Sequence, residues 1–418
     1  MANLQRAKGT RDFSPKETIL RNKIVNILKN NFEKFGFSPI ETPIIERFDV
    51  LASKYAGGDE ILKEIFKFND QGKRELALRY DLTVPLCRYI GMNLDIKFPF
   101  KRYQIERVYR DGPIKLGRYR EFYQCDIDII GSKSMLSELQ LMEVAYNVFN
   151  ELKLNVNIKI NNRKLMNGLL NDLGIIKQED KEKIILSIDK LYKIGEEEVK
   201  KEILSIGINE NKINELFNIF KIKNLNEIKV NNEIGKEGLN ELKELFNYLD
   251  ELNVKCTFDV TLARGLSYYT GTVFEIFLIN NEIKSAVAGG GRYDNMISDF
   301  LESKQKYPAV GISFGLEVIN DALKNEDGQK NVTELFIIPI NTINECIKIA
   351  SQLRKKNIKV DYDLMDRGIS KNLQYANSLG IKYVAIIGED ELKNNKIKIK
   401  NMISGEEKLY NIEEIKLE

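Results

Sequence analysis

The segment Phe98–Gly131, FPFKRYQIERVYRDGPIKLGRYREFYQCDIDIIG, decides how the rest of the chain is interpreted. It predicts two β-strands joined by a loop, because Asp111, Gly112 and Pro113 favour a turn between two strand-forming runs. In the second strand apolar and polar side chains alternate. One face of this strand is therefore apolar, and the other carries arginines, an amide and carboxylates.

The polar face of the second strand has two interpretations. It is either an ordinary solvated sheet face, which the spacing alone favours, or the floor of a ligand site. Arg110 and Arg118 would suit a phosphate or carboxylate group, because the guanidinium fork binds both. Gln124 and Asp128, four residues apart on one face, could hold a cationic or hydrogen-bonding group of the same ligand.

The composition restricts the chemistry that the chain can perform. Its 418 residues, 43% hydrophobic and 30% charged, predict a soluble globular protein of two or three domains. The chain contains no histidine. Catalysis by a histidine base, histidine-containing triads and histidine-ligated metal sites are therefore excluded.

Net charge, cysteine spacing and the length of apolar runs indicate the cellular compartment of the protein. A net charge of +2 gives no general attraction for nucleic acid, so any RNA surface must be local. The four cysteines are scattered without a CxxC pair, which predicts neither a metal site nor a disulfide framework and favours a reducing cytosol. No apolar run has the length of a membrane span, and the first residues lack the apolar segment of a signal peptide.

The segment before Phe98 predicts a helix followed by extended chain. Ser14-Pro15-Lys16-Glu17 forms a capping box, and Gly36 would end the helix. The next segment, Phe37–Glu46, carries two prolines, which place it at a sheet edge or an interface. Further on, Asp81 and Thr83 would cap a second helix. Taken alone, these two residues therefore have a structural role.

A second informative stretch is Leu262–Phe277, LARGLSYYTGTVFEIF, followed by Gly289–Asp294, GGGRYD. It predicts a loop with an arginine and two tyrosines, then a strand, a turn and a returning strand at Ile283–Ala288. The glycines after that strand either allow a ligand to approach the backbone closely or form a tight turn.

The remaining segments predict helices and a second sheet. Residues from about 165 to 252 have helical periodicity, and 308–320 predicts a strand entering a helix. The polar segment 324–332 is a linker. Residues 333–418 alternate strands and helices in a βαβαβ order with a final hairpin, which predicts a small, mostly parallel sheet. A generic α/β regulatory domain is the alternative interpretation of this last segment.

Together these stretches resemble the histidyl-tRNA synthetase family of class II aminoacyl-tRNA synthetases. GRYREFYQCDIDIIG resembles motif 2, the segment with Pro43 resembles motif 1, and LARGLSYYTG with GGGRYD resembles the histidine-binding signature. The resemblance implies an α/β fold: an α+β catalytic domain at 1–323, with an antiparallel sheet flanked by helices and a helical insertion at about 165–252. A linker at 324–332 and an anticodon-binding-like domain at 333–418 complete the expected organisation.

The resemblance also implies a reaction and its participants. The expected activity is ATP-dependent activation of L-histidine to histidyl-adenylate and transfer to tRNA(His), by a cytoplasmic homodimer with Mg²⁺ and no protein-bound metal site. Arg264 and Arg110 are the expected catalytic residues at the ATP α-phosphate. The residues expected to hold nucleotide are Arg110, Arg118 and Arg264, and those expected to hold histidine are Asp81, Thr83, Gln124, Asp128, Tyr268 and Tyr269.

Two positions depart from the family pattern and leave rival functions open. The motif 3 arginine is replaced by Val318, and the acidic residue of motif 2 by Gly112, with Asp111 as the candidate substitute. Both positions serve ATP binding in class II enzymes. One rival is a catalytically silent histidine sensor, such as the regulatory subunit of ATP phosphoribosyltransferase, and the other is an RNA sensor without synthesis. The retained arginines and the C-terminal domain favour the enzyme.

Overall fold

The structure, a computed structural model, describes residues 4–52, 62–114, 119–265, 268–324, 330–415 and 417. The chain forms two compact units, which consist mainly of Ile24–Leu323 and Lys324–Glu418. Each unit is considered by itself below. No helix within the described ranges is long and apolar enough to cross a membrane.

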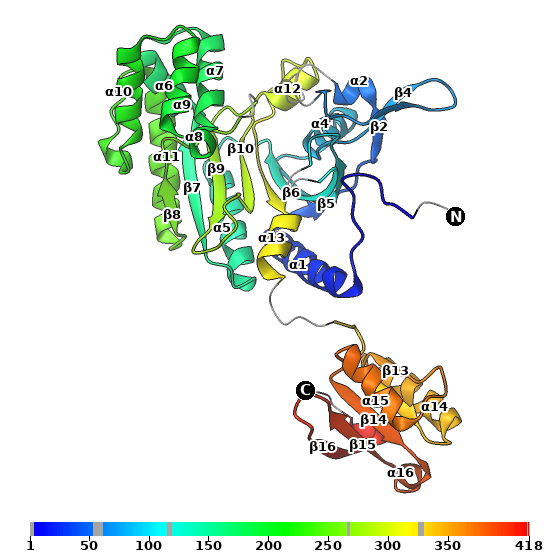
Figure 1. Cartoon of the computed structure of the whole chain (residues 1–418). Coiled ribbons are helices and arrows are strands. Elements are labelled where there is room, and N and C mark those ends of the chain that lie inside the picture. The colour runs from blue at the N-terminus through cyan, green and yellow to red at the C-terminus, as the bar shows by residue number, and fades with distance from the viewer. Residues whose placement is uncertain are drawn as a thin grey trace. The chain divides into compact units, whose positions relative to one another are not determined.

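The first unit is built on an eight-stranded sheet (Figure 1). Neighbouring strands are antiparallel except for the outermost pair at each edge. This confirms the predicted antiparallel sheet. In sheet order the strands are β1 (Ser38–Pro39), β5 (Phe100–Tyr109), β6 (Glu121–Ile130), β11 (Ala309–Gly315), β10 (Ala288–Arg292), β9 (Thr272–Leu278), β7 (Val156–Asn162) and β8 (Cys256–Phe258).

Strands β5 and β6 are the two strands that the opening segment predicts. They pair along their whole length, from Phe100 opposite Ile130 to Tyr109 opposite Glu121. The polar side chains of β6 do not form a solvated face, because Asp126 and Asp128 are buried. The solvated-face interpretation is therefore wrong for these two residues.

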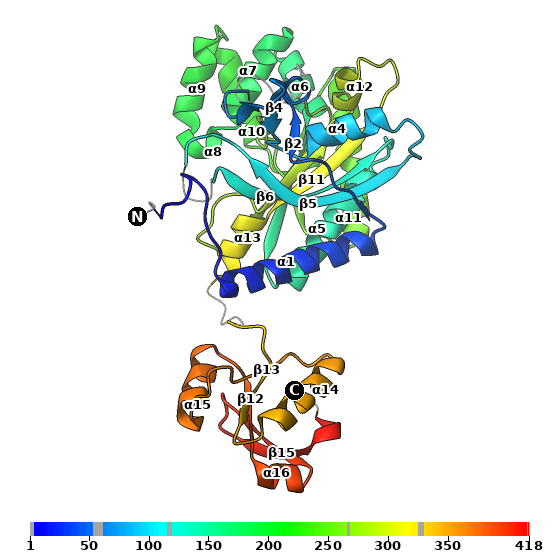
Figure 2. The ribbon, with the colours of Figure 1, turned by 90° about the vertical axis from the view of Figure 1, so that its right-hand side faces the viewer.

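The apolar face of the sheet is covered by helices α1 (Pro15–Lys34) and α5 (Leu136–Glu151). The ring of Phe314 on β11 lies 5.5 Å from that of Phe32 on α1 and 5.9 Å from that of Phe149 on α5. Figure 2 shows α1 running along this side of the sheet. The predicted capping box is present: the Ser14 N–H donates to Oε2 of Glu17 over 2.7 Å. A core on this face leaves the opposite face for the polar residues of β6.

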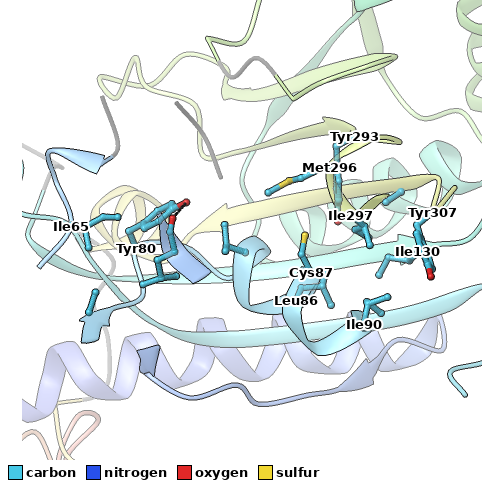
Figure 3. Close-up of a cluster of buried hydrophobic side chains, with 14 residues drawn as sticks. Ile65, Tyr80, Leu86, Cys87, Ile90, Ile130, Tyr293, Met296, Ile297 and Tyr307 are labelled. Carbon is cyan, nitrogen blue, oxygen red and sulfur yellow. Dashed lines mark hydrogen bonds between the residues drawn. The ribbon is translucent and has the colours of Figure 1, made fainter. Parts of the chain in front are cut away.

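A separate hydrophobic cluster lies beside the polar face (Figure 3). It joins helix α4 (Thr83–Met92) and helix α12 (Met296–Phe300) to the end of β6 and to Tyr293, which follows β10. The three-stranded sheet β2 (Ile45–Arg47), β4 (Glu75–Leu78) and β3 (Lys67–Asn69), with α2 (Phe48–Leu51), adjoins it. The cluster fixes the start of α4 and the residue Tyr293 near the polar side chains of β6.

The predicted helical segment is present between β7 and β8. Its helices gather beside these strands in Figure 1. They are α6 (Arg163–Asp172), α7 (Gln178–Ile188), α8 (Leu191–Ile194), α9 (Glu196–Ser205), α10 (Glu210–Phe220) and α11 (Glu233–Glu251), with a 3₁₀ turn at Leu225–Glu227.

The predicted returning strand at Ile283–Ala288 is wrong. Residues 279–287 are irregular, and the strand β10 begins at Ala288 and runs through the glycines themselves. Gly289–Gly291 pair with β9 on one side and with β11 on the other. A glycine run can form a central strand here because both neighbouring strands supply its hydrogen bonds.

The second unit confirms the predicted βαβαβ order and final hairpin. Strands β13, β12 and β14 are parallel, and β15 and β16 continue the sheet in antiparallel fashion. In chain order the elements are β12 (Leu335–Pro339), α14 (Ile343–Lys355), β13 (Val360–Tyr362), α15 (Ile369–Ser378), β14 (Tyr383–Ile387), α16 (Glu389–Lys393), β15 (Lys396–Asn401) and β16 (Glu407–Asn411). Helix α13 (Leu316–Leu323) ends the first unit.

Candidate active site

A cavity of about 380 Å³ lies against the polar face of the large sheet. The described part of the chain contains all but one of the residues predicted for histidine and nucleotide, and every one of those lines this cavity. They are Asp81, Thr83, Arg110, Gln124, Asp128, Arg264, Tyr268 and Tyr269. Arg118 lies outside the described residues. Segments that are far apart in the sequence therefore meet at one place.

Asp128 is held from two sides by the protein. It lies opposite Arg102 in the β5–β6 pair, and its Oδ2 is 2.6 Å from Nη2 of Arg102. The Tyr293 hydroxyl donates a hydrogen bond to its Oδ1. A Cβ atom at Gly311, opposite it on β11, would lie 2.0 Å from Oδ1, so only glycine leaves room for the carboxylate. Burial raises the pKa of Asp128, while Arg102 and Tyr293 act in the opposite direction.

Asp81 both caps helix α4 and lines the cavity. Its Oδ1 accepts the N–H of Val84 over 3.1 Å, which caps the first turn of α4. The same side chain lines the cavity beside Thr83. Burial raises the pKa of Asp81 to about 6. The capping role therefore does not exclude contact with a ligand.

Two buried acceptors in the cavity make no hydrogen bond within the described residues. They are Oε1 of Gln124 and Oδ1 of Asp126. Burial raises the pKa of Asp126 to about 7, against the opposing effect of Arg102. Buried acceptors are almost always paired in folded proteins. These two atoms therefore indicate a ligand that brings N–H donors into the cavity.

Two arginines supply positive charge to the same cavity. Arg110 donates from Nε to the Tyr80 carbonyl over 3.0 Å, and its guanidinium lies 5.2 Å from the Phe122 ring centroid. Arg264 donates from Nη1 to the Phe274 carbonyl over 3.3 Å, with Glu275 at 3.7 Å. Among the described residues, each of these arginines donates one hydrogen bond. Both therefore retain N–H groups for an anion.

The structure reveals site residues that sequence reasoning missed. Asp126, Glu275, Tyr293 and Glu317 line the cavity. Two of them carried a sequence signal: Asp126 lies between Gln124 and Asp128 on the polar face of β6, and Tyr293 belongs to GGGRYD. Glu275 inside β9 and Glu317 in the first turn of α13 carried none.

The two departures from the family pattern are also visible. Val318 lines the cavity and presents an apolar side chain where an arginine was expected. A Cβ atom at Gly112 would lie 2.7 Å from Oε1 of Glu64, so a carboxylate from another segment occupies the space beside this glycine. Asp111, the predicted substitute, is instead 2.8 Å from Nη2 of Arg120. Glu64 thus places a carboxylate beside Gly112, while the carboxylate of Asp111 is paired with Arg120.

The cavity has carboxylates that could coordinate a metal ion, but the described residues do not form a complete coordination site. The described residues contain no cluster of three or more His, Cys, Asp or Glu side chains placed to hold a metal. Mg²⁺ is commonly bound by one or two carboxylates together with substrate phosphates. Glu275 and Glu317 on the cavity wall fit that pattern.

Comparisons with known proteins agree with this geometry. A family model described as histidyl-tRNA synthetase matches residues 9–319, and one described as anticodon binding domain matches residues 334–417. Histidine–tRNA ligase 1 of Bacillus cereus is 46% identical over 416 residues, which cover 97% of each chain. The crystal structure of histidyl-tRNA synthetase from Nostoc superposes with a TM-score of 0.88 at 30% identity, covering 98% of this chain and 97% of that one.

A third similarity concerns the fold alone. A crystal structure described as an ATP phosphoribosyltransferase regulatory subunit/histidyl-tRNA synthetase from Bacillus halodurans is 21% identical, with a TM-score of 0.77. The superposition covers 90% of this chain and 97% of that one.

Both family models and the near full-length identity agree with the site geometry, and the chain belongs to the histidyl-tRNA synthetase family.

Proposed function

We propose that the cavity is where this chain activates L-histidine with ATP and then transfers it to tRNA(His). The observation that carries the proposal is the combination of charges in one cavity. Arg110 and Arg264 supply positive charge for phosphate, while Asp81, Asp126 and Asp128 supply carboxylate acceptors for a nitrogen-rich ligand. A ligand with an ammonium group, an imidazole and a carboxylate, placed beside a triphosphate, satisfies both sets.

Asp128 and Tyr269 would bind the imidazole of histidine. Neutral imidazole offers one N–H donor and one lone pair. An ionised carboxylate has about four acceptor positions, and Arg102 and Tyr293 use two of those on Asp128. Asp128 can thus accept the imidazole N–H, and the Tyr269 hydroxyl can donate to the other nitrogen.

Asp81, Thr83 and Gln124 would bind the ammonium group of histidine. Oε1 of Gln124 is buried and makes no hydrogen bond within the described residues, so it needs a donor from the ligand. Asp81 adds a carboxylate next to the first turn of α4. Tyr268 packs against Tyr269, with ring centroids 4.7 Å apart, and closes this part of the cavity.

The reaction needs positive charge more than covalent help. A carboxylate oxygen of histidine attacks the α-phosphorus of ATP, and the bond to the bridging oxygen breaks, which releases pyrophosphate. Arg110 and Arg264 are placed to stabilise charge on the α-phosphate oxygens. Phe122 and Val318 offer apolar surface for the adenine ring. Mg²⁺, held by the phosphates with Glu275 or Glu317, would neutralise further phosphate charge.

Three further properties are proposed from the family. We propose a homodimer, supported by exposed apolar side chains at Ile44 and Ile45, next to Pro43 in the segment that resembles motif 1. We place the protein in the cytoplasm, where tRNA is charged. The four cysteines are unpaired, which suits a reducing compartment. The unit around Lys324–Glu418 is proposed to bind the anticodon arm of the tRNA.

A catalytically silent histidine sensor is the second candidate. Val318 and Gly112 favour it, because both replace residues that bind ATP in class II enzymes. The carboxylate of Glu64 beside Gly112 weakens that argument. Arg110 and Arg264 remain in the cavity, and a sensor without adenylation would not need both.

The Asp128→Asn variant tests the assignment of the histidine site. The substitution keeps the shape but removes a charge-assisted hydrogen bond, worth about 1.5–3 kcal/mol. We expect kcat/KM for histidine in ATP–pyrophosphate exchange to fall at least about tenfold. The KM for ATP should change much less.

Asp259→Asn is the matched control. Asp259 is equally buried and also ion-paired, with Lys159 at 2.9 Å, but does not line the cavity. If Asp128→Asn leaves kcat/KM for histidine unchanged while the protein stays folded, the assignment is wrong. Equal losses for histidine and ATP, or equal losses in the control, would indicate general damage to the fold.

A further inference from the structure

Arg102 is a fully buried arginine behind the cavity. It lies on β5, is 0% exposed, and does not line the cavity. Its Nη2 is 2.6 Å from Oδ2 of Asp128 and 3.4 Å from the carbonyl oxygen of Leu82. Its Nε and Nη1 are buried and make no hydrogen bond within the described residues. Buried, unpaired N–H groups destabilise a fold, so an arginine here needs an explanation other than stability.

The two contacts of Arg102 connect the two segments expected to hold histidine. Asp128 belongs to β6, and Leu82 lies between Asp81 and Thr83 at the start of α4. One guanidinium nitrogen therefore contacts both the imidazole acceptor and the turn that carries the residues for the ammonium group.

Arg102 also sets the charge of this end of the cavity. Burial raises the pKa values of Asp81, Asp126 and Asp128, and the positive charge of Arg102 lowers each of them. Of the three carboxylates, Asp128 alone makes an ion pair with Arg102 in the described structure. Asp128 is therefore the carboxylate whose ionised form this arginine favours most directly.

The other neighbours of Asp128 cannot take over this role. Tyr293 is neutral, and its ring is anchored in the hydrophobic cluster shown in Figure 3. Gly311 has no side chain. Arg110 and Arg264 line the cavity but form no ion pair with Asp128 among the described contacts.

We propose that Arg102 is a positioning residue for histidine recognition, which keeps Asp128 ionised and ties the Asp81–Thr83 turn to β6 without touching the substrate. This inference rests on the proposed function, in which Asp128 accepts the imidazole N–H. Removing the guanidinium leaves Asp128 buried without a counter-charge. A carboxyl in that situation takes up a proton and stops acting as an ionised acceptor.

Arg102→Met is the principal test, because methionine is long, flexible and apolar. We expect the KM for histidine in ATP–pyrophosphate exchange to rise about tenfold or more, with less than about a threefold change in the KM for ATP. Arg102→Lys keeps a positive charge but loses the guanidinium fork. We expect its KM for histidine to lie between those of wild type and Arg102→Met, at least about twofold above wild type.

Arg79→Met is the matched control for the loss of a buried arginine. Arg79 is also 0% exposed, and it bonds the Thr42 carbonyl over 2.7 Å and the Glu106 carboxylate over 2.5 Å instead of Asp128. We expect Arg79→Met to lower the melting temperature without a selective change in the KM for histidine. A selective rise in this control equal to that of Arg102→Met would overturn the proposal, and so would an Arg102→Met effect shared equally by histidine and ATP.

Combining Arg102→Met with Asp128→Asn separates the inference from the proposed function. If Arg102 acts mainly through Asp128, adding Arg102→Met to Asp128→Asn should raise the KM for histidine clearly less than Arg102→Met does alone, and the remaining rise measures the contact with Leu82. An equal rise in both backgrounds would contradict the proposal. If Asp128→Asn alone has no effect, the proposed histidine site is wrong. If Asp128→Asn raises the KM and Arg102→Met does not, only the present inference is wrong. Where Arg102→Met fails to fold, an unchanged KM for histidine in Arg102→Lys contradicts the inference.

Discussion

A Cβ atom on Gly289 would lie 2.0 Å from Nη1 of Arg264. The glycine in the central strand β10 therefore makes the space in which the Arg264 guanidinium lies. Arg264 comes from the loop before β9, so the two residues meet only in the folded sheet. This contact explains why position 289, next to the proposed phosphate-binding arginine, carries no side chain.

Gly289→Ala should displace Arg264 and slow activation while leaving the protein folded. The closest atom is the end of a flexible side chain, so the guanidinium can move aside, but a misplacement of about 1 Å can lower a rate on the order of 10²-fold. Histidine-dependent ATP–pyrophosphate exchange and thermal unfolding would be measured together. Gly368→Ala is the control, because nothing lies within 4 Å of its added Cβ. Equal exchange rates in the two variants would contradict the role of Gly289.

Arg264→Ala should nearly abolish adenylate formation without unfolding the protein. Loss of one preorganised charge at the transferred phosphate lowers rates by roughly 10²–10³-fold. Its partners, the Phe274 carbonyl and Glu275 at 3.7 Å, are weak enough that stability should change little. Arg47→Ala, which removes an exposed arginine paired with Asp49, should leave exchange unchanged. A drop of less than threefold in Arg264→Ala would count against the assignment.

Asp126 should make the stability of the free protein fall as the pH rises. Burial raises its pKa to about 7 from an ordinary value near 3.8, so the folded state holds a proton that the unfolded state has already lost. Unfolding therefore becomes easier between about pH 4 and pH 7, and the loss persists above pH 7. Asp126→Asn cannot ionise and should be more stable than wild type at pH 8, with little difference at pH 4. Urea unfolding at both pH values decides, and parallel profiles would refute the prediction.

The exposed apolar residues near Pro43 should form the dimer contact. Light scattering of the wild-type protein should give a mass near twice 48.3 kDa. Ile45→Glu, at a position 50% exposed, should shift the protein toward monomer, because a buried charge without a partner opposes association. Leu364→Glu, at a position 77% exposed in the second unit, is the control and should remain dimeric. An active wild-type monomer at micromolar concentration would rule out the proposed dimer.

The sequence predicted the fold well where one face of an element is apolar. The alternation in Phe98–Gly131 and the capping box at Ser14 each give the observed strand pair and helix start. The sequence pattern places the glycine run at a strand end, whereas it lies inside strand β10. Its place depends on the pairing of β9 and β11 around it, and glycines carry no side-chain pattern that reports this pairing.

The site was predictable only where the motifs carry it. Arg102 was missed because its partner Asp128 is fixed by the register of β5 and β6, and the long loop between them does not specify that register. Glu64 was missed for a similar reason, since it approaches Gly112 from a different segment. Contacts between distant segments depend on the three-dimensional fold, which these local sequence patterns do not report.

The central claim is that this chain activates histidine with ATP, and ATP–pyrophosphate exchange measures that step directly. We expect exchange with wild-type protein, Mg²⁺ and L-histidine, little exchange with other amino acids, and no requirement for tRNA. A folded protein that binds histidine but catalyses no exchange would contradict the account and would behave as a histidine sensor instead.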